Sequence, residues 1–294
     1  METDSRPSME QLIAQTATLF SLPEVVVRLN EVVERPGATV SDIAEVIGQD
    51  PALTVRLLRQ ANSPFYGLSQ AVDTVSQAVV LLGAQRIRDM VLSAAVSDRF
   101  GQLTMPHEPL EDFWRHSIYA AILARDLAGR CVRGREESLF IGGLIHDIGQ
   151  MLLFHALPEV AHAAFLHSLD GRGDQDPVAA EREVIGFDHA VLGGAVLEGW
   201  GLPPLLVDCV RYHHAPSGSQ RFPLEVSVVH IANSIAHLAA LDSRDPADAP
   251  PIDVVAWHRV GLSEAIVEGA ILRAQHRVVE VEEMLMLPRR AAAA

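Results

Sequence analysis

At 294 residues, with 49% hydrophobic residues and a mean hydropathy of +0.17, the chain has enough apolar side chains for one large or two modest folded domains, which excludes a mainly disordered protein. The net charge of -15 opposes nonspecific nucleic-acid binding, because that binding needs Lys and Arg side chains to neutralise phosphates. The only cysteines, Cys131 and Cys209, form no CxxC pair, so neither a disulfide framework nor a cysteine zinc site is expected.

The N-terminal segment 1–7 is polar and lacks the charged-then-apolar pattern of a secretory signal. No apolar run along the chain approaches the roughly 18 residues of a membrane helix. We therefore expect a cytoplasmic protein with no membrane segment.

Residues 9–100 carry helix signals and no alternating strand pattern. Pro23 and Glu24 open a helix, because proline is tolerated in a first turn and glutamate there meets the helix dipole. Asp50 followed by Pro51 is a strong start signal for another helix. Two more helices are predicted at 74–82 and 84–96, separated by a glycine.

The two helices within residues 40–60 could form a helix-turn-helix that offers Arg56 and Arg59 to DNA. The alternative is an ordinary packed helix pair whose arginines are solvated. The acidic chain favours the second interpretation, so we expect no DNA binding.

The second half of the chain is again helical, and the polar, proline-containing break at 101–109 separates the halves. We predict an all-α protein of two helical subdomains, 1–105 and 106–242, followed by a loop and C-terminal helical extension at 243–294. Helices in the second half are expected at 110–129, 136–146, 158–169, 177–185, 189–199, 203–213, 223–241 and 265–286. The last helix can pack on the rest of the chain or on a second copy, so a homodimer stays open.

His146 and Asp147 follow the apolar, glycine-containing helix at 136–146. A buried carboxylate needs a counter-charge, because its desolvation costs several kcal/mol. The nearest basic residues, Arg133 and Arg135, lie in a polar loop before the helix. A divalent metal is therefore one hypothesis, and a hydrogen-bonded polar pair at a helix end is the alternative.

The 13 histidines are not evenly distributed. Asp112 and His116 lie four residues apart and share a helix face, and His189 and the doublet His213-His214 lie on two further helices. Helical bundles build internal metal sites from such inward-facing residues on different helices. Seven other histidines are expected to be surface or core residues: His107, His155, His162, His167, His237, His258 and His276. His230 is expected to pack in the core.

Seven separated motifs resemble those of the HDOD domain in order and approximate spacing, over residues 19–241. They are Leu22-Pro23-Glu24, Gln49-Asp50-Pro51-Ala52-Leu53, Ala61-Asn62-Ser63, Ala78-Val79-Val80-Leu81-Leu82-Gly83, Phe113-Trp114-Arg115-His116-Ser117, Gly143-Leu144-Ile145-His146-Asp147-Ile148-Gly149 and Gly199-Trp200-Gly201-Leu202-Pro203. The resemblance implies an all-helical bacterial signalling module of the HD superfamily. Such modules usually lack demonstrated catalysis and often occur beside response-regulator or cyclic-di-GMP modules.

The second half also resembles the HD-GYP phosphodiesterases, which implies a metal-ligand set in this chain of Asp112, His116, His146, Asp147, His189, His213 and His214. Three departures weaken the expectation of catalysis. Asn233, a neutral and weaker ligand, stands where the phosphodiesterases have a final Asp, and Gln150 stands where they have a Lys. Ala215-Pro216-Ser217-Gly218 replaces their Gly-Tyr-Pro loop.

We therefore favour a non-catalytic regulatory module that binds a signalling protein partner, such as a response-regulator or cyclic-di-GMP module, and carries a metal. The alternative is a metal-dependent phosphohydrolase acting on a nucleotide or cyclic dinucleotide. One or two divalent ions are expected, with iron favoured and manganese, nickel or zinc open, because the set is too rich in nitrogen for calcium or magnesium. Asp147 would bridge two ions, with Asp112, His189, His213 and His214 around one and His116, His146 and the weak ligand Asn233 around the other.

Overall fold

The computed structural model describes residues 8–19, 22–101, 103, 105–106, 109–169, 177–243 and 245–287. Within these residues every regular element is a helix and no β-strand occurs. The predicted all-α class is therefore confirmed.

The described residues of the first half form six helices, and side-chain caps at Thr39, Asp50 and Thr74 mark the starts of three of them. Asp50 accepts a hydrogen bond from the backbone N–H of Leu53 at 3.0 Å, and Thr39 and Asp42 form a reciprocal capping box. Gly83 separates two of the helices with a φ of 87°, a left-handed conformation that favours glycine. The helices are α1 (Met9–Leu19), α2 (Glu24–Glu34), α3 (Val40–Gly48), α4 (Pro51–Ala61), α5 (Val75–Leu82) and α6 (Ala84–Phe100).

The second half contains two helices that the sequence did not predict, α9 and α15. The α9 helix begins at Ile148, directly after His146-Asp147. Its apolar residues continue the apolar pattern of the preceding helix, so the sequence shows no separate start. The α15 helix is short and is capped by Asp253, which accepts from the N–H of Ala256 at 2.8 Å. The helices are α7 (Leu110–Cys131), α8 (Glu136–Ile145), α9 (Ile148–Ala156), α10 (Pro158–Leu169), α11 (Pro177–Val184), α12 (His189–Gly199), α13 (Pro204–Tyr212), α14 (Pro223–Leu241), α15 (Val254–Val260) and α16 (Glu264–Leu285), with 3-10 turns η1 (Pro216–Gly218) and η2 (Pro246–Asp248).

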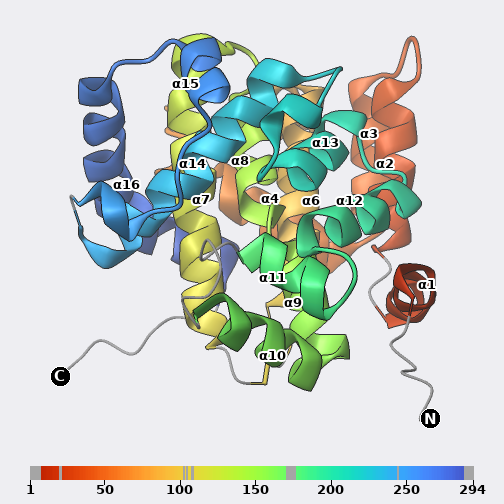
Figure 1. The fold of residues 1–294 in the computed structure, drawn as a ribbon. Coiled ribbons are helices and arrows are strands. Elements are labelled where there is room, and N and C mark those ends of the chain that lie inside the picture. The colour runs from red at the N-terminus through yellow and green to blue at the C-terminus, as the bar shows by residue number, and fades with distance from the viewer. Residues whose placement is uncertain are drawn as a thin grey trace, which may run out of the picture.

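The long helix α7 organises the molecule, because it packs against α8, α14 and α16 (Figure 1). The α2 and α3 helices lie at one side, and α16 lies at the opposite side. One cluster of buried apolar side chains extends from Leu12 to Leu287 and includes Trp114 and Phe140, both fully buried. The predicted division into segments 1–105, 106–242 and 243–294 stays a prediction, and residues 102, 104, 107 and 108 near its first boundary lie outside the described residues.

The pair α3 and α4, considered above as a DNA-binding motif, is packed into the core. Arg56 forms an ion pair with Asp98, and Arg59 donates a hydrogen bond to the carbonyl of Glu283 at 3.3 Å. Both arginines therefore contact the protein itself. The absence of DNA binding stays a prediction that these contacts support.

The C-terminal helix α16 packs on the body of the same chain. Ala270, Ala274 and Val278 are buried, and the helix contacts α7 and α14. Two segments, 136–156 and 223–241, are long and apolar enough to cross a membrane by length and composition alone, but 78% and 67% of their apolar windows are buried inside the protein. The first segment comprises α8 and α9 and the second is α14, and all three helices belong to the core.

Candidate metal centre

The break between α8 and α9 places His146 and Asp147 in the interior. His146 follows the last residue of α8, Asp147 precedes the first residue of α9, and both side chains are buried. Close packing of α9 on α12 brings a further histidine to the same point. A Cβ at Gly149 would overlap the carbonyl oxygen of His189, so glycine is needed for this approach.

Two groups of side chains meet at Asp147 and could hold metal ions. The first group comprises Asp147, His189, His213 and His214, and the second comprises His116, His146 and Asp147. In each group the ligand atoms lie within 4.8 Å of one another. The first group draws its histidines from α12 and the end of α13, and the second from α7 and the end of α8.

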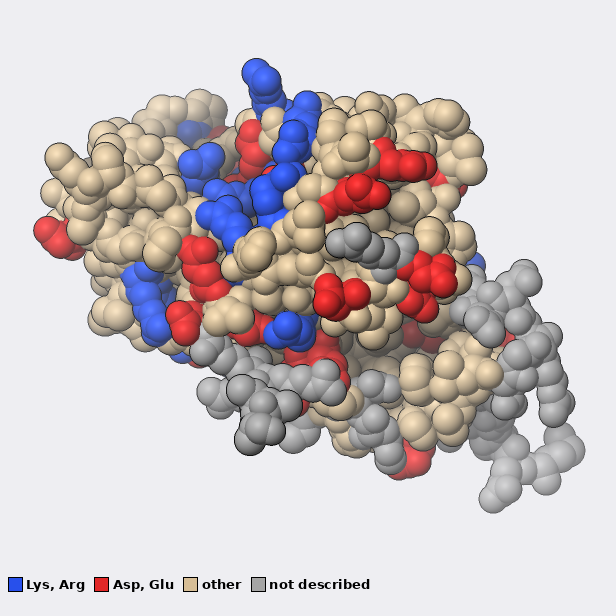
Figure 2. Space-filling view, turned by 90° about the vertical axis from the view of Figure 1, so that its left-hand side faces the viewer, with Lys and Arg blue, Asp and Glu red and all other residues tan. Residues whose placement is uncertain are grey.

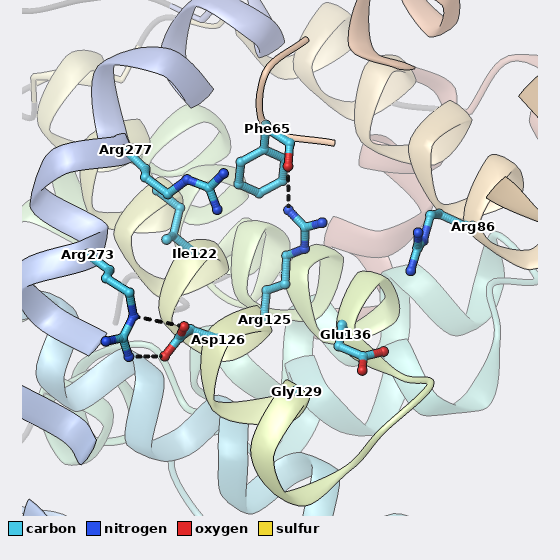
Figure 3. Close-up of a pocket in the computed structure, with 9 residues that line it drawn as sticks. All are labelled: Phe65, Arg86, Ile122, Arg125, Asp126, Gly129, Glu136, Arg273 and Arg277. Carbon is cyan, nitrogen blue, oxygen red and sulfur yellow. Dashed lines mark hydrogen bonds and ion pairs between the residues drawn. The ribbon is translucent and has the colours of Figure 1, made fainter. Parts of the chain in front are cut away.

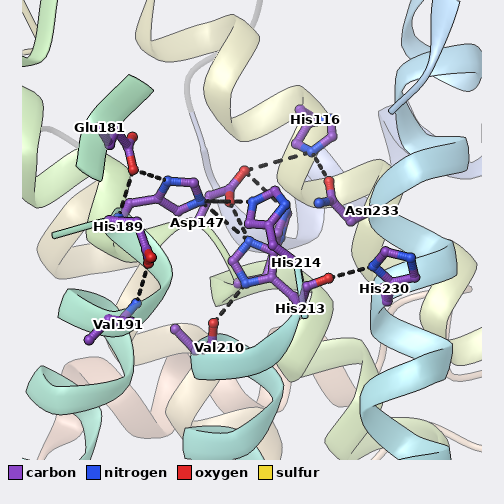
Figure 4. A network of polar contacts seen from close by, with 12 residues as sticks. His116, Asp147, Glu181, His189, Val191, Val210, His213, His214, His230 and Asn233 are labelled. Carbon is purple, nitrogen blue, oxygen red and sulfur yellow. Dashed lines mark hydrogen bonds and ion pairs between the residues drawn. The ribbon is translucent and has the colours of Figure 1, made fainter. Parts of the chain in front are cut away.

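The two carboxylate oxygens of Asp147 face different groups (Figure 4). Oδ1 lies 3.3 Å from His189 Nε2 and 3.3 Å from His213 Nε2. Oδ2 lies 3.0 Å from His146 Nε2 and 3.8 Å from His116 Nε2. This is the arrangement that a carboxylate bridging two cations requires.

Hydrogen bonds at Nδ1 fix how the imidazole rings face Asp147. His146 Nδ1 donates to the carbonyl of Gly143 and His213 Nδ1 donates to that of Val210, each at 2.7 Å. Because a carbonyl only accepts, each neutral ring must present its Nε2 lone pair to the carboxylate. His146 Nε2 is buried and has no hydrogen-bond partner. Lone pairs that face an anion need a cation between them, so the donor set fits a metal ion.

The charges within the centre are strongly perturbed. Burial by itself would raise the pKa of Asp147, but the surrounding imidazoles, His146 first, outweigh burial and hold that pKa well below 3.8. Burial would lower the pKa of His189, but Glu181 and Asp147 raise it well above 6.5. Without a metal, a proton on His189 is thus the cation beside Asp147.

Two other rings are neutral at physiological pH, as metal ligation requires. Burial, reinforced by neighbouring imidazoles, lowers the pKa of His213 to about 4. Burial, with His237 and His146 nearby, lowers the pKa of His116 to about 3. The Nε2 atom of His213 is available without the loss of a proton, whereas that of His116 also contacts the amide oxygen of Asn233 at 2.9 Å.

Six of the eight residues singled out from the sequence meet in these groups, and two do not. Asn233 lies at the edge of the second group, with Oδ1 2.9 Å from His116 Nε2. Asp112 belongs to neither group, although it was expected beside His189, His213 and His214. The α7 helix carries His116 to the Oδ2 side of Asp147, and Asp112 lies one turn earlier on the same face.

Two residues at the centre were not singled out by the sequence. Glu181 on α11 accepts hydrogen bonds from His189 Nδ1 at 2.7 Å and from the His189 backbone N–H at 2.8 Å. No motif or spacing indicated it. The ring of His237 lies 4.5 Å from that of His116, centroid to centroid. Its position four residues after Asn233, one turn along α14, could have drawn attention to it.

His230 has the structural role that was expected of it. Its Nδ1 donates to the carbonyl of His213 at 2.6 Å, and its Nε2 accepts from the backbone N–H of Asp253 at 2.9 Å. Both ring nitrogens are therefore occupied by backbone groups. His230 fixes the end of α13, where the His213-His214 doublet lies.

Fold and site together define an all-helical protein with an internal histidine and aspartate centre that could hold one or two metal ions. The model of the HDOD domain family matches residues 19–216. The chain therefore belongs to the HDOD domain family.

Solved structures show the same fold. A provisionally named phosphohydrolase from Shewanella amazonensis SB2B is 26% identical with a TM-score of 0.71, covering 94% of this chain and 97% of that one. An HDOD domain protein of unknown function from Geobacter sulfurreducens is 22% identical with a TM-score of 0.72, covering 94% of this chain and 98% of that one.

A relative was also found by sequence comparison. An uncharacterized protein of Treponema pallidum (strain Nichols) is 25% identical over 243 residues, which are 81% of this chain but only 46% of that relative.

Proposed function

We propose that this protein is a regulatory HDOD module that carries a metal centre and acts by binding a protein partner rather than by turnover. The observation that carries the proposal is the position of Asp147, whose two oxygens each face a separate set of imidazole nitrogens at 3.0 to 3.8 Å. A buried carboxylate in such surroundings is stable only beside a cation.

In this proposal His189, His213, His214 and Asp147 would hold one ion, and His116, His146 and Asp147 would hold a second. The nitrogen-rich set favours iron, with manganese, nickel or zinc as alternatives, and disfavours calcium and magnesium. A bound ion would supply a fixed positive charge, and an oxidation-state change if it is iron. The chain's residues orient the imidazoles and keep water from the ion.

Burial of the centre favours a regulatory role over turnover. His146 and His213 are fully buried, and the most open side chains of the second group, His116 and Asp147, are only 16% and 12% exposed. A phosphate ester therefore has little access to the ligands.

A metal-dependent phosphohydrolase remains the second candidate, because a carboxylate between two groups of ligands is also how two-metal hydrolases hold their ions. The provisional name of the Shewanella amazonensis relative points the same way. Against it, the neutral Asn233 lies where an anionic ligand would help the second ion.

Elemental analysis of protein purified without chelator tests the metal, and a phosphatase and phosphodiesterase screen of the same sample separates the two candidates. We expect near one equivalent of transition metal and no turnover. Less than about a tenth of an equivalent would remove the metal centre from the proposal. Turnover that disappears in Asp147→Ala would favour the hydrolase.

We propose that the partner is a signalling protein, such as a response-regulator or cyclic-di-GMP module, and that the two proteins bind in the cytoplasm. Purified candidates of both kinds can be titrated into the metal-loaded protein by calorimetry. Saturable binding that weakens when the metal is removed is the expected result. Failure of every such candidate to bind would contradict this choice of partner.

A further inference from the structure

A second site lies away from the metal centre, in the cavity of about 350 Å³ between α16, α7, α8 and the start of α6 (Figure 3). This volume is within the range of small-molecule sites. The lining residues come from parts of the chain far apart in sequence: Phe65, Arg86, Ile122, Arg125, Asp126, Gly129, Glu136, Arg273 and Arg277.

The lining is basic in an acidic protein. The chain has a net charge of -15, and all of its 23 basic residues are arginine. Four of them surround this cavity against two carboxylates, Asp126 and Glu136. Figure 2 shows that basic side chains gather in a column on the face of the molecule that carries α16.

Two of the guanidinium groups are held on one aromatic ring. Arg125 lies 4.0 Å and Arg277 4.9 Å from the centroid of Phe65, which is buried. Arg125 also donates to the carbonyl of Phe65 at 3.5 Å. These cation–π contacts restrict both guanidinium groups at the cavity and leave N–H groups of each available for an anion.

The carboxylates nearby only partly neutralise these arginines. Arg273 is well paired, with two hydrogen bonds to Asp126 at 3.1 and 2.7 Å. Arg125 lies 3.9 Å from Glu137, and Arg277 lies 3.8 Å from Glu280, both beyond hydrogen-bond distance. Among the described residues Arg86 makes no ion pair. Arg86, Arg125 and Arg277 thus leave positive charge directed at the cavity.

We propose that this cavity binds a small phosphate-bearing ligand, with Arg86, Arg125 and Arg277 donating to its phosphate oxygens. Guanidinium groups match phosphate by paired, charge-assisted hydrogen bonds, and several arginines on a rigid frame favour a phosphate over a carboxylate. The proposal does not depend on the metal centre, because no residue is shared between the two sites.

Calorimetric titration with inorganic phosphate, pyrophosphate and ATP, at low ionic strength, tests this site. We expect one saturable site for pyrophosphate or ATP, with affinity that falls as salt is raised. The double variant Arg86→Gln with Arg277→Gln should weaken binding at least tenfold. Asp126→Asn should strengthen it several-fold, because it removes a negative charge from the lining and releases Arg273.

Two controls separate this site from other sources of binding. Arg28→Gln changes an arginine of α2 that contacts Gln49 outside the cavity and should leave the affinity unchanged. His213→Ala damages the metal centre and should also leave the phosphate affinity unchanged. Loss of phosphate binding in this variant would instead show that a metal ion holds the phosphate. Far-UV circular dichroism confirms folding of each variant, and Asp126→Asn keeps the test valid if the double variant fails to fold.

If ATP binds more tightly than pyrophosphate, the ligand class is a nucleotide. If the two affinities are equal, the site recognises the phosphate groups alone. Both results support the site. The proposal is overturned if none of the three anions binds at about 10 mM. It is equally overturned if the double variant and Asp126→Asn bind as the unchanged protein does.

Discussion

The two groups of ligands that share Asp147 are unequal. The first has three imidazoles, and a carboxylate behind one of them, because Glu181 accepts from His189 Nδ1 at 2.7 Å. The second has two imidazoles, and the neutral Asn233 lies 2.9 Å from His116 Nε2. We therefore expect anionic support, rather than the number of histidines alone, to determine which group of the proposed centre holds an ion more firmly.

The largest expected effect comes from the residue that both groups share. Asp147→Ala should remove metal from both groups, because it deletes the carboxylate that the two groups share. Elemental analysis measures the loss. Asp112→Ala is the matched control, since Asp112 belongs to neither group and the variant should keep its metal. Equal losses in both variants would show that Asp112 is a ligand and that the grouping described here is incomplete.

The next largest effect distinguishes the first ligand group from the second. His213→Ala should lower the metal affinity of the first group by at least about tenfold. His116→Ala should lower only the metal occupancy of the second group, which we expect to bind more weakly. Competition titration with a metal chelator resolves the two affinities. If His116→Ala caused the greater loss, the order of the two groups would be reversed.

Glu181 tests the support behind the first group. Glu181→Gln keeps the size and an acceptor but removes the charge beside His189, so metal affinity should fall by about tenfold. Glu183→Gln, on the same helix and 73% exposed, provides the control and should change nothing. An unchanged affinity in Glu181→Gln would mean that the carboxylate only positions the ring.

Asn233 tests the second group in the opposite direction. Asn233→Asp supplies the missing anion beside His116, so occupancy of the second ion should rise, by several-fold at subsaturating metal. Metal content per chain, measured at two metal concentrations, shows the change. No rise would indicate that the second group lacks something other than negative charge.

The smallest expected effect concerns pH, at a buried carboxyl outside the centre. Imidazoles lower the pKa of Asp147, whereas burial raises the pKa of Glu137 from 4.5. Folded protein therefore keeps a proton on Glu137 after the unfolded chain has lost it, and this group makes stability fall as pH rises from 4.5 through the folded pKa. Glu137→Gln should make that fall shallower while retaining the acceptor for the Tyr66 hydroxyl. Thermal unfolding from about pH 4 to pH 8 measures the slope, and an unchanged slope would contradict the assignment.

The sequence predicted the helices well where start signals are local. Asp50 caps α4 as expected, and the starts of α7, α12 and α14 agree with the predicted ranges. It missed α9, because the break at His146-Asp147 contains no proline or polar run to separate two apolar helices. It missed α15, because the 7 residues of this helix make only about two turns, too few to show a helical period.

The sequence predicted most of the candidate ligands, because an imidazole or carboxylate on an apolar helix is visible in the chain and the HDOD motifs put His116, His146 and Asp147 in order. The packing of the helices sets which side of Asp147 each histidine faces, leaves Asp112 outside both groups, and puts Glu181 behind His189. The arginine cavity is likewise a tertiary feature, since Phe65, Arg125 and Arg277 are separated by many residues. The physical reason is that helical periodicity records which face of a helix is buried, whereas the rotation and contact point of one helix on another depend on packing across the whole core.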